Sequence, residues 1–473
     1  MNLLELYHAS PIWLQNVMCT MEGWRILRQR YGGSFQSSLD EIRAFERLSH
    51  AEVADRQESM LRSMLNYAYA HVPFYHQTWP EVFPIDDKQD AFEVLRTLPL
   101  LDRSMVKSKL DAFVSDEYRG RHLVPYPTGG TSGSPLVMRY TPQQVQRTFA
   151  FSEARIRNWA GVTFRSKQAT FLGKRVVPVD QRSGPFWRVN RAGNQTLFSI
   201  FHLNDKTAPE YVAALNKLKP EMIVGYVTPV YMLSRFIVES GESVKFRPRL
   251  IWTSSETLED YQRETIETAF DCRVTNAYSG AEGVALITEC IHGGLHISPD
   301  FGVIEMLPVE GSPGLREIVG TTLFNFSMPL VRYRTGDLVE PDAGGCTCGL
   351  PFPTVKRIIG RLDDTIRTPA GTLVSSAPLS LVFQEAEGIH ESQLVQTSDS
   401  EVVAKIVPSG SPDRVPVEEV VRGLQSRLGS DMRVRVEIVQ EIPRGQNGKF
   451  RFIVGLRSIH TIPNRRSRAR GAS

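Results

Sequence analysis

The chain has 473 residues, of which 41% are hydrophobic and 23% charged, and its formal net charge is +3. This length exceeds a single typical hydrophobic core, so we expect two or three domains. The last ten residues, NRRSRARGAS, carry four Arg, and removing these from +3 leaves −1. The positive charge therefore belongs to the tail (459–473). This favours a solvated, disordered tail over a segment that contacts nucleic acid or an anionic membrane.

The sequence contains no run of 18 apolar residues, so we expect no membrane-spanning helix. The N-terminal stretch MNLLELYHASPIWLQNVMC is apolar, but it has no basic start and no clear small-residue cleavage site, unlike a signal peptide. Five Cys in a chain of this length do not make a disulfide framework. Together these features predict a cytoplasmic protein.

The predicted elements begin with a helical segment, residues 1–84. The spacing of apolar residues within 60–67 is helical, and Pro73 interrupts that pattern. Further along, Asp102 stands where the side chain of an N-cap residue would begin a helix at Arg103.

A glycine- and hydroxyl-rich segment, TGGTSGSP (128–135), follows between two strand-like stretches. Its three glycines allow backbone N–H groups to approach an anion, and its Thr and Ser residues add hydroxyl donors. It lacks the Lys of the G-x-x-x-x-G-K-[ST] loop. Two interpretations remain from the residues alone, a phosphate-binding loop and an ordinary surface turn.

From residue 165 onward, strand-like and helix-like stretches alternate. The strand-like stretches are 168–173, 220–226, 248–255 and 273–280, and the helix-like stretches are 205–219, 228–241 and 257–270. This alternation predicts an α/β fold with a parallel or mixed sheet.

The segment 314–338 is β-rich and compatible with a small barrel. After Arg361 the pattern changes to a βααβ-like segment of about 100 residues. We therefore expect a large N-terminal α/β domain with mixed sheets and a β-rich subdomain (1–360), followed by a small, mobile α+β C-terminal domain (361–458).

Four more motifs follow the Gly-rich segment in a fixed order. They are AYSGAEG (277–283), YRTGDL (333–338), GRLDDTIRTPAG (360–371) and PRGQNGKF (443–450). In this order and spacing the series resembles the adenylate-forming superfamily, which includes acyl- and aryl-CoA ligases, peptide-synthetase adenylation domains and luciferases. The resemblance covers residues 85–455.

The compact GGTSGSP loop is most similar to the phenylacetate–CoA ligase-like branch. The stretches LYHASPIWLQNVMCTMEGWRILRQRYGG and PFWRVN resemble the CapK-like proteins of capsular polysaccharide biosynthesis within it.

The resemblance implies that the protein joins a carboxylic acid to the α-phosphate of ATP, giving an acyl-adenylate and pyrophosphate. The acyl group would then pass to a thiol such as that of CoA. Two alternatives stay open: a ligase that uses an amine or hydroxyl acceptor instead of CoA, and a nucleotide-binding protein of low activity. We expect a small-molecule acid as partner and no nucleic acid, and the sequence leaves the oligomeric state open.

The resemblance also implies roles for individual residues. Glu282 would help to hold Mg²⁺, Asp337 would accept hydrogen bonds from the ribose, and Lys449 would bridge the carboxylate and the α-phosphate, with Thr131 also catalytic. The full set implied for ATP or AMP is Thr128, Gly129, Gly130, Thr131, Ser132, Gly133, Ser255, Glu256, Thr257, Ala277, Tyr278, Ser279, Glu282, Asp337 and Arg361.

Several of these residues also have a structural interpretation. Glu282 suits a helix N-terminus, Asp337 a turn, Lys449 a hairpin and Tyr278 a core. The sequence also departs from the family pattern, because Ala281 replaces the residue whose hydroxyl would face the phosphates.

By analogy, Tyr226, Pro229 and Trp252 would line the acid pocket. Lys174, Arg175, Trp187 and Arg188 could meet an acidic or aromatic substrate, form a lid, or serve ordinary packing and surface charge. Asp363 matches the hinge residue about which the small domain rotates, and Gly360 before it changes φ and ψ at low cost. The alternative for Asp363 is a simple Asp-Asp turn.

The cysteines suggest a metal site. Cys346 and Cys348 form a C-x-C pair in a Gly-rich loop, and Cys290 and His296 lie upstream. Two thiolates, a third Cys and a His fit tetrahedral Zn²⁺, and a site filled by protein ligands is structural. His292 is the rival fourth ligand, and buried free thiols are the alternative to a metal.

Overall fold

The computed structural model describes residues 3–79, 83–128, 136–178, 180–310, 312–445 and 449–456. Five residues of the expected phosphate loop (Gly129, Gly130, Thr131, Ser132 and Gly133) lie outside these ranges, as do the side chain of Asp363 and the basic tail. None of the helices in the described ranges is both long enough and apolar enough to cross a membrane.

The N-terminal part is helical, as expected. Its helices are α1 (Leu3–Ala9), α2 (Ile12–Tyr31), α3 (Phe35–Phe45), α4 (His50–His71), α5 (Pro73–Thr78), α6 (Ala91–Thr97) and α7 (Arg103–Ser108). Ser49 and Glu52 form a capping box at the start of α4, and Pro73 occupies the first turn of α5. The predicted cap of α7 is confirmed, because the Asp102 side chain accepts a hydrogen bond from the backbone N–H of Met105.

The central feature is one mixed sheet of 12 strands within the described ranges, in the order β11-β12-β13-β14-β10-β9-β8-β7-β6-β3-β5-β4. The strands are β3 (Gln168–Phe171), β4 (Trp187–Asn190), β5 (Gln195–Phe198), β6 (Met222–Gly225), β7 (Leu250–Ser254), β8 (Val274–Ser279), β9 (Leu286–Glu289), β10 (Leu295–Ile297), β11 (Gly302–Val309), β12 (Ser312–Thr322), β13 (Tyr333–Pro341) and β14 (Thr354–Arg361). β1 (Val124–Pro127) and β2 (Val137–Tyr140) form a separate antiparallel pair on either side of the Gly-rich segment.

The sheet has two halves. Strands β5, β3, β6, β7 and β8 are parallel neighbours, and β8 to β11 continue as antiparallel neighbours. The helices around the sheet are α8 (Pro142–Ser152), which continues as a π-helix (Glu153–Asn158), α9 (Ala208–Leu218), α10 (Val227–Ser240) and α11 (Asp260–Phe270). The expected α/β alternation is therefore present. The barrel considered for 314–338 is wrong, because the strand order is linear and β11 and β4 are its two edges.

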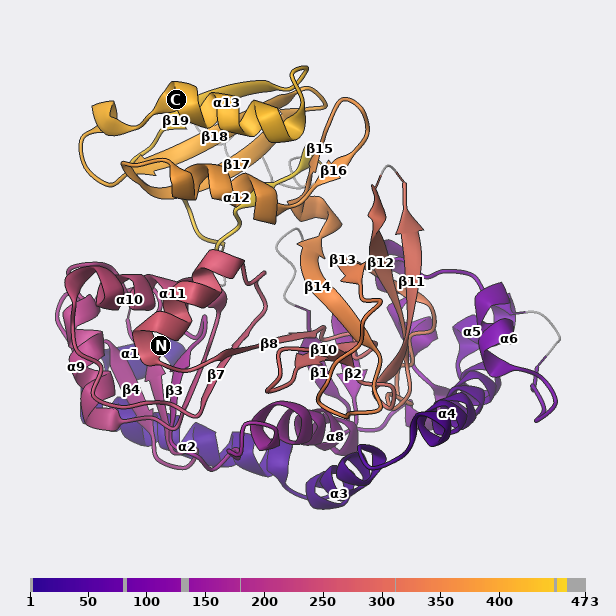
Figure 1. The fold of residues 1–473 in the computed structure, drawn as a ribbon. Helices are drawn as coiled ribbons and strands as arrows, with labels where there is room; N and C mark the ends of the chain where they lie inside the picture. The colour runs from indigo at the N-terminus through magenta and orange to yellow at the C-terminus, as the bar shows by residue number, and fades with distance from the viewer. Residues whose placement is uncertain are drawn as a thin grey trace, which may run out of the picture.

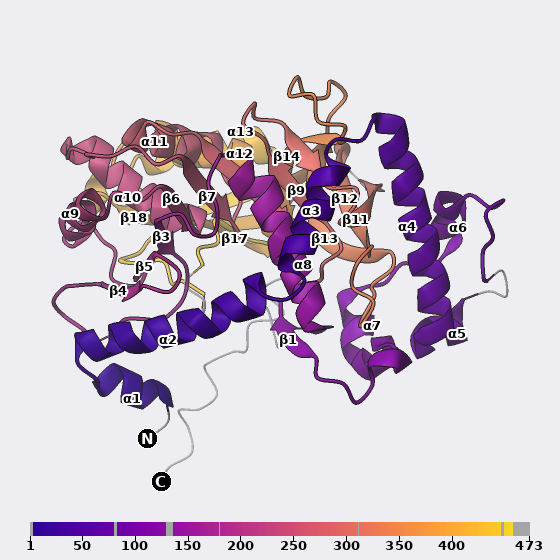
Figure 2. The ribbon, with the colours of Figure 1, turned by 90° about the horizontal axis from the view of Figure 1, so that it is seen from below.

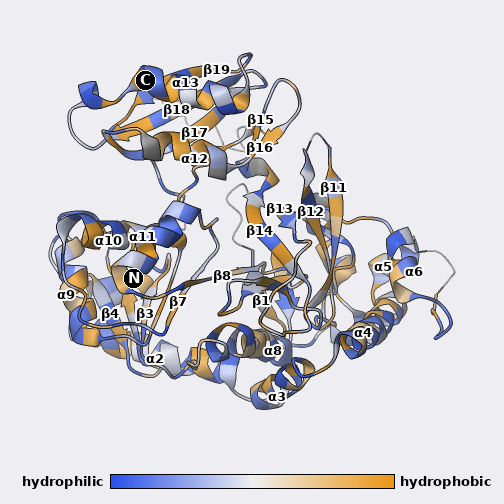
Figure 3. Ribbon diagram, in the orientation of Figure 1, coloured by the Kyte–Doolittle hydropathy of each residue, from blue (hydrophilic) through white to orange (hydrophobic). Residues whose placement is uncertain are grey.

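Residues 366–454 form a C-terminal lobe with its own core, which is built from buried residues between Ile366 and Ile453. Its elements are β15 (Ile366–Arg367), β16 (Leu373–Val374), α12 (Ser376–Glu385), β17 (Ile389–Ser398), β18 (Glu401–Pro408), α13 (Val417–Leu428), β19 (Arg433–Ile438) and β20 (Ile453–Val454). Four of the strands form a sheet in the order β19-β18-β17-β20. In Figure 1 the lobe lies above α10, α11 and the upper end of β14, and β17 and β18 carry many of its hydrophobic residues (Figure 3).

Candidate active site

Predicted site residues gather where the parallel strands end. β6, β7 and β8 end at Gly225, Ser254 and Ser279. Tyr226 and the segment 255–257 follow the first two ends directly, and the segment 277–282 spans the third. Ligands of open α/β sheets bind at the carboxyl ends of the strands. The sheet therefore brings three separate sequence motifs to its ligand-binding edge.

The carboxylate of Asp337 connects Tyr278 of the segment 277–282 with Arg361. The Tyr278 hydroxyl donates to Asp337 Oδ2 at 2.7 Å, and Arg361 Nε lies 3.5 Å from Asp337 Oδ1. Asp337 and Arg361 are direct partners in the β13–β14 ladder. Burial raises the pKa of Asp337, and the positive charge of Arg361 opposes that rise. Tyr278 is thus more than a core aromatic, because its hydroxyl contacts the carboxylate expected to bind the ribose.

The segment Ser255–Thr257 approaches the same strands closely. Gly360 has φ +103°, and a Cβ there would lie 2.6 Å from Thr257 Oγ1, so this position requires glycine for both backbone conformation and space. Ser255 itself has φ +70°, a left-handed conformation that is uncommon for a side chain other than glycine. Such backbone strain is often found in ligand-binding segments.

Lys449 reaches this edge from the C-terminal lobe. Its Nζ lies 5.2 Å from the centre of the Tyr226 ring. Burial lowers the pKa of Lys449, and the negative charge of Glu256 acts in the opposite direction. Glu256 accepts hydrogen bonds from the backbone N–H groups of Thr228 at 2.8 Å and Phe450 at 3.3 Å. One buried carboxylate therefore connects the start of α10 with the lysine segment of the lobe.

Glu282 lies beside a residue that the sequence did not single out, Arg103. Arg103 Nη1 lies 3.6 Å from Glu282 Oε1, and Arg103 Nη2 donates to Thr128 Oγ1 at 2.8 Å. The backbone N–H of Thr128 donates to the carbonyl of Leu136 at 2.8 Å and so closes the base of the Gly-rich segment. The available sequence signal for Arg103 was the N-cap at Asp102, which fixes the helix whose first residue is this arginine.

Glu282 does not stand at a helix N-terminus, because it lies in a turn after β8. The neighbouring Ala281 lacks a hydroxyl, and its carbonyl accepts a hydrogen bond from the Tyr140 hydroxyl at 2.8 Å. Gly283 follows with φ +65°, and a Cβ there would lie 2.4 Å from the Tyr140 oxygen. The turn that presents Glu282 is therefore packed against Tyr140 of β2, directly after the Gly-rich segment.

The three residues expected at the acid pocket lie in different surroundings. Tyr226 caps α10 beside Lys449, and Pro229 is buried in the first turn of the same helix. Trp252 lies on β7 in a small apolar cluster, with Arg157 Cζ 5.2 Å from its ring centre. Arg188 is fully buried and donates to the carbonyl of Pro185 at 2.9 Å, so the packing interpretation holds for that residue.

Asp363 lies within a short 3₁₀ helix (Leu362–Asp364) after β14, which agrees with a turn at the expected hinge. The next residue, Asp364, accepts a hydrogen bond from Arg451 Nε at 2.8 Å. Arg451 is two residues beyond Lys449, so an ion pair connects the hinge segment with the lysine segment.

The four residues proposed as metal ligands do come together. One donor atom from each of Cys290, His296, Cys346 and Cys348 lies within 4.8 Å of the others. The Cys290 and Cys346 sulfurs are 3.6 Å apart, and Cys348 Sγ is 3.2 Å from His296 Nε2. Tetrahedral zinc with bonds of about 2.0–2.3 Å sets its donor atoms about 3.3–3.8 Å apart. The spacing and the donor types therefore fit zinc.

The surroundings of this cluster favour His296 over His292. His296 Nδ1 lies 3.3 Å from the carbonyl of Phe352, which leaves Nε2 directed at the sulfurs. His292 contributes no donor to the four-atom cluster, and only its backbone N–H contacts Cys290 Sγ, at 3.4 Å. Gly294 is also required here, because a Cβ at that position would lie 2.6 Å from Cys346 Sγ.

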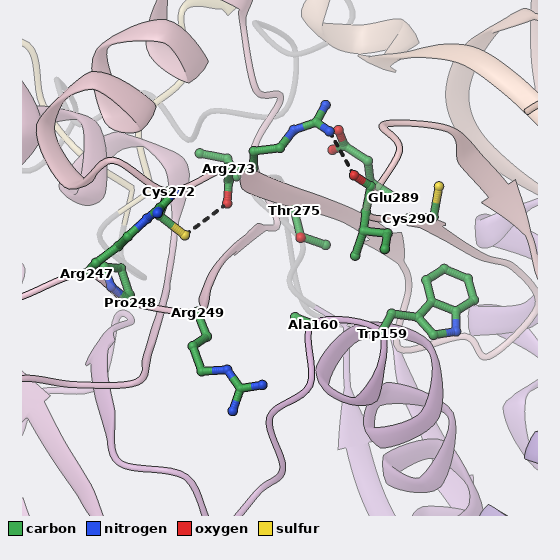
Figure 4. A pocket seen from close by; sticks show the side chains of 12 residues that line it. Trp159, Ala160, Arg247, Pro248, Arg249, Cys272, Arg273, Thr275, Glu289 and Cys290 are labelled. Atoms are coloured by element: carbon green, nitrogen blue, oxygen red, sulfur yellow. Dashed lines mark hydrogen bonds between the residues drawn. The ribbon is translucent and has the colours of Figure 1, made fainter. Parts of the chain in front are cut away.

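A cavity of about 470 Å³ lies next to the cluster and includes Cys290 in its lining. Figure 4 shows Arg249 and Trp159 around this cavity, together with Arg273 at the start of β8. Arg249 and Arg273 precede the first residues of β7 and β8, whereas the predicted nucleotide residues lie at or after the last ones. The cavity thus lies at the strand edge opposite the candidate active site.

The fold is that of solved adenylate-forming CoA ligases. Residues 366–455 match the CapK C-terminal domain family. A solved structure of 2-hydroxyisobutyryl-CoA ligase, in the postadenylation state with an acyl-AMP, aligns with a TM-score of 0.64 at 19% identity, covering 88% of this chain and 92% of that one. The same enzyme in the thioesterification state aligns with a TM-score of 0.53.

In sequence, the chain is similar to a CapK protein and to phenylacetate–coenzyme A ligases. It is 27% identical over 457 residues to protein CapK of Staphylococcus aureus, covering 95% of this chain and 98% of that protein. It is 25% identical over 480 residues to a phenylacetate–coenzyme A ligase of Thermus thermophilus, covering 87% and 98%. The resemblance drawn from the motifs is therefore confirmed.

Proposed function

We propose that this protein activates a small carboxylic acid as an acyl-adenylate, releases pyrophosphate and transfers the acyl group to a thiol of the CoA type. The observation that supports this most directly is the placement of Lys449. This residue comes from the C-terminal lobe, yet its Nζ lies over Tyr226 at the ligand edge of the main sheet. A cation there can neutralise both the acid carboxylate and the α-phosphate as they approach each other.

The other residues divide the work of binding ATP. The Asp337 carboxylate would accept hydrogen bonds from the ribose hydroxyls, with Tyr278 and Arg361 holding it in place. The segment 128–133 would bind the β- and γ-phosphates through backbone N–H and hydroxyl groups. Arg103 would hold Thr128 at the start of that segment and add a positive charge near the leaving pyrophosphate.

Glu282 would be the protein ligand of Mg²⁺. Magnesium prefers oxygen ligands and uses few protein carboxylates when phosphates share its coordination. The Glu282 side chain is 12% exposed, and its salt-bridge partner Arg103 is 31% exposed, so a cation bound with the phosphates could replace this contact. Bound Mg²⁺ would offset the negative charge of the triphosphate.

We also propose that Cys290, His296, Cys346 and Cys348 hold one structural Zn²⁺. All four positions of a tetrahedron would be filled by protein atoms, so no position remains for substrate. Hydrogen bonds support the thiolate form of Cys346. Burial acts to raise its pKa, but contacts with the backbone of Cys348 and the thiols of Cys348 and Cys290 outweigh burial and lower it.

An exchange assay tests the proposed activity. The purified protein is incubated with ATP, Mg²⁺ and labelled pyrophosphate, and aryl, fatty, hydroxy and amino acids are added in turn. We expect one class of acid to stimulate exchange of label into ATP. CoA and then amines and alcohols are added to the acid that succeeds, and the product identifies the acceptor. Nucleotide binding without exchange for any acid would instead favour a nucleotide-binding protein of low activity.

A further inference from the structure

Helix α2 packs on the protein through a side that mixes the polar residues Gln15, Asn16 and Thr20 with partly buried apolar ones. It lies along β4, one edge strand of the main sheet. Asn16 Oδ1 accepts a hydrogen bond from the backbone N–H of Val189 at 2.8 Å, and Thr20 Oγ1 accepts one from that of Arg191 at 3.2 Å. These contacts cover N–H groups that an exposed edge strand would leave free to pair with another chain.

Two further residues fix the rotation of α2 about its axis. Gln15 is 2% exposed, and its side-chain oxygen accepts a hydrogen bond from the buried Arg188. Gly23 is also buried, and a Cβ there would lie 2.0 Å from Asn190 Oδ1. The helix can approach β4 this closely only with glycine at position 23. The side of α2 that carries Gly23 must therefore face the sheet.

The outward side of α2 is apolar as a consequence. Trp13 is 67% exposed, Met21 67% and Trp24 65%, with Val17 at 45%. At about 100° per residue these four lie within an arc of about 80°. Leu4 and Leu6 of α1 are also exposed, and Figure 2 shows α1 next to α2 on the outside of the molecule. α2 therefore presents an apolar face to solvent, unlike an ordinary surface helix.

This face, which we call the α1–α2 patch, is large for a monomer. Its members are Leu4, Leu6, Ile12, Trp13, Val17, Met21 and Trp24. Together they expose on the order of 700 Å², because a Trp side chain alone accounts for about 150 Å² at two-thirds exposure. The largest patch on a typical monomer is about 300–600 Å², and a stable interface buries about 800 Å² on each partner. The patch thus supplies most of what a dimer needs.

The charges around the patch favour a second protein surface over a bilayer. The exposed charged residues of α1 and α2 are Glu5, Glu22, Arg25 and Arg28, which sum to zero. Glu22 and Arg25 also pair with each other, at 2.6 Å. Helices that lie in membrane interfaces are rich in Lys and Arg on the polar face. Of the three Arg of α2, Arg25 pairs with Glu22 and Arg30 lies over the ring of Phe149, which leaves Arg28 to meet an anionic headgroup. The segment 457–473 is also poorly suited to bury the α1–α2 patch, because its only large apolar residues are Ile459 and Ile462.

We propose that the α1–α2 patch is the interface of a homodimer in which the two α2 helices pack antiparallel about a twofold axis between Val17 and Met21. Trp13 of each copy then lies beside Trp24 of the other. The end of α2 that carries Arg28 lies near Glu5 of the other copy, so opposite charges meet at both ends. An isologous contact of this kind buries the same patch on both chains and closes at two subunits.

Sedimentation of the full chain tests this proposal with a matched pair of variants. Val17→Arg places two like charges near the twofold axis, whereas Val238→Arg makes the same change at a valine of equal exposure on α10, 46% against 45%. We expect the wild type and Val238→Arg to be dimers at about 10 μM, and Val17→Arg to dissociate at least 30-fold more readily. The thermal midpoint of Val17→Arg, compared with that of Val238→Arg, verifies that the surface change leaves the monomer folded.

Three outcomes would overturn the dimer. One is a wild-type monomer at about 200 μM. The second is equal dissociation of the two Arg variants. The third is a monomer that binds phosphatidylglycerol vesicles and loses this binding in Val17→Arg, which would assign the patch to a membrane. The dimer does not depend on the proposed ligase activity, because sedimentation measures the molecular mass of the protein and not its activity.

Discussion

The thiol–imidazole cluster and the candidate active site are assembled in different ways. All four residues of the cluster come from the antiparallel half of the main sheet, between β9 and β14, and the β9–β10 and β10–β14 ladders hold them in place. The candidate active site combines β8, β13 and β14 with residues 449–450 of the C-terminal lobe. The cluster is thus complete within the large part of the protein, which comprises the helices and sheet up to β14. The active site depends on how the C-terminal lobe packs against that large part.

This difference separates two kinds of effect. A change in the cluster should lower the free energy of unfolding. It should affect ligand binding only indirectly, through that loss of stability. A change in the lobe residues of the active site should alter reaction rate while the large part still binds nucleotide, because Asp337, Tyr278 and Arg361 belong to the large part. The following changes test that separation, beginning with the largest expected effect.

Replacing Lys449 with Ala should reduce pyrophosphate exchange by about 100- to 1,000-fold, because the developing charge between carboxylate and α-phosphate loses its cation. ATP affinity should stay within about twofold, since the proposed nucleotide contacts of the large part remain. Exchange rates and calorimetric ATP binding measure the two quantities. Lys405→Ala, on β18 of the same lobe, is the control. An equal loss of exchange and affinity would contradict the assigned role.

Replacing Cys346 with Ser should remove bound zinc and destabilise the large part by about 3 kcal/mol, because a structural metal contributes directly to folding. Metal analysis should find about one zinc per chain in the wild type. Denaturant unfolding measures the change in stability, and Cys272→Ser, outside the cluster, should keep its zinc. If the wild-type protein contained no zinc, the metal site would be wrong and the alternative of buried free thiols would hold.

Replacing Asp337 with Ala should weaken ATP binding by about 1.5–3 kcal/mol, the scale of hydrogen bonds to a charged group. The zinc content should not change, because the side chain is remote from the cluster in the β13–β14 ladder. Asp342→Ala provides the control, since Asp342 follows the same strand at its other end and accepts a hydrogen bond from Thr354. Unchanged affinity in Asp337→Ala would exclude this carboxylate from the ribose site.

The sequence predicted those features that depend on local order along the chain. The cap at Asp102, the α/β alternation and the grouping of Cys290, His296, Cys346 and Cys348 follow from spacing and residue type. Arg103 was missed because its contacts, to Thr128 and Glu282, join residues far apart in the sequence. The barrel was wrong because β12 and β13 continue an open sheet, and pairing between distant strands leaves no local signal.

Helix α2 is a second case in which the local sequence pattern does not predict the contacts. Helical periodicity finds the apolar stripe from Trp13 to Trp24 but gives it no direction, and a stripe is ordinarily assigned to the core. In the structure Asn16 and Thr20 instead face the sheet and accept hydrogen bonds from the backbone N–H groups of Val189 and Arg191. The roles of Glu282, Lys449 and the segment 129–133 in catalysis stay predictions.

The smallest expected effect concerns the contact between the two parts of the active site. Glu256→Gln removes the negative charge that acts to raise the pKa of Lys449, while burial continues to lower it. Lys449 must carry its proton to neutralise the acid and phosphate, so exchange is lost as pH rises through the pKa of this lysine. The alkaline limit of exchange should therefore move to lower pH in Glu256→Gln.

A pH profile of exchange at saturating ATP measures this shift, and Glu401→Gln is the matched control, because Glu401 of the lobe pairs with Arg433 at the start of β19, outside the motif 443–450. The backbone N–H groups of Thr228 and Phe450 donate to different oxygens of Glu256, and an amide has one acceptor oxygen, so Glu256→Gln keeps one of these hydrogen bonds while removing the charge. An unchanged alkaline limit would mean that the carboxylate positions the lobe without tuning the lysine. The active site would then depend on the lobe for placement alone.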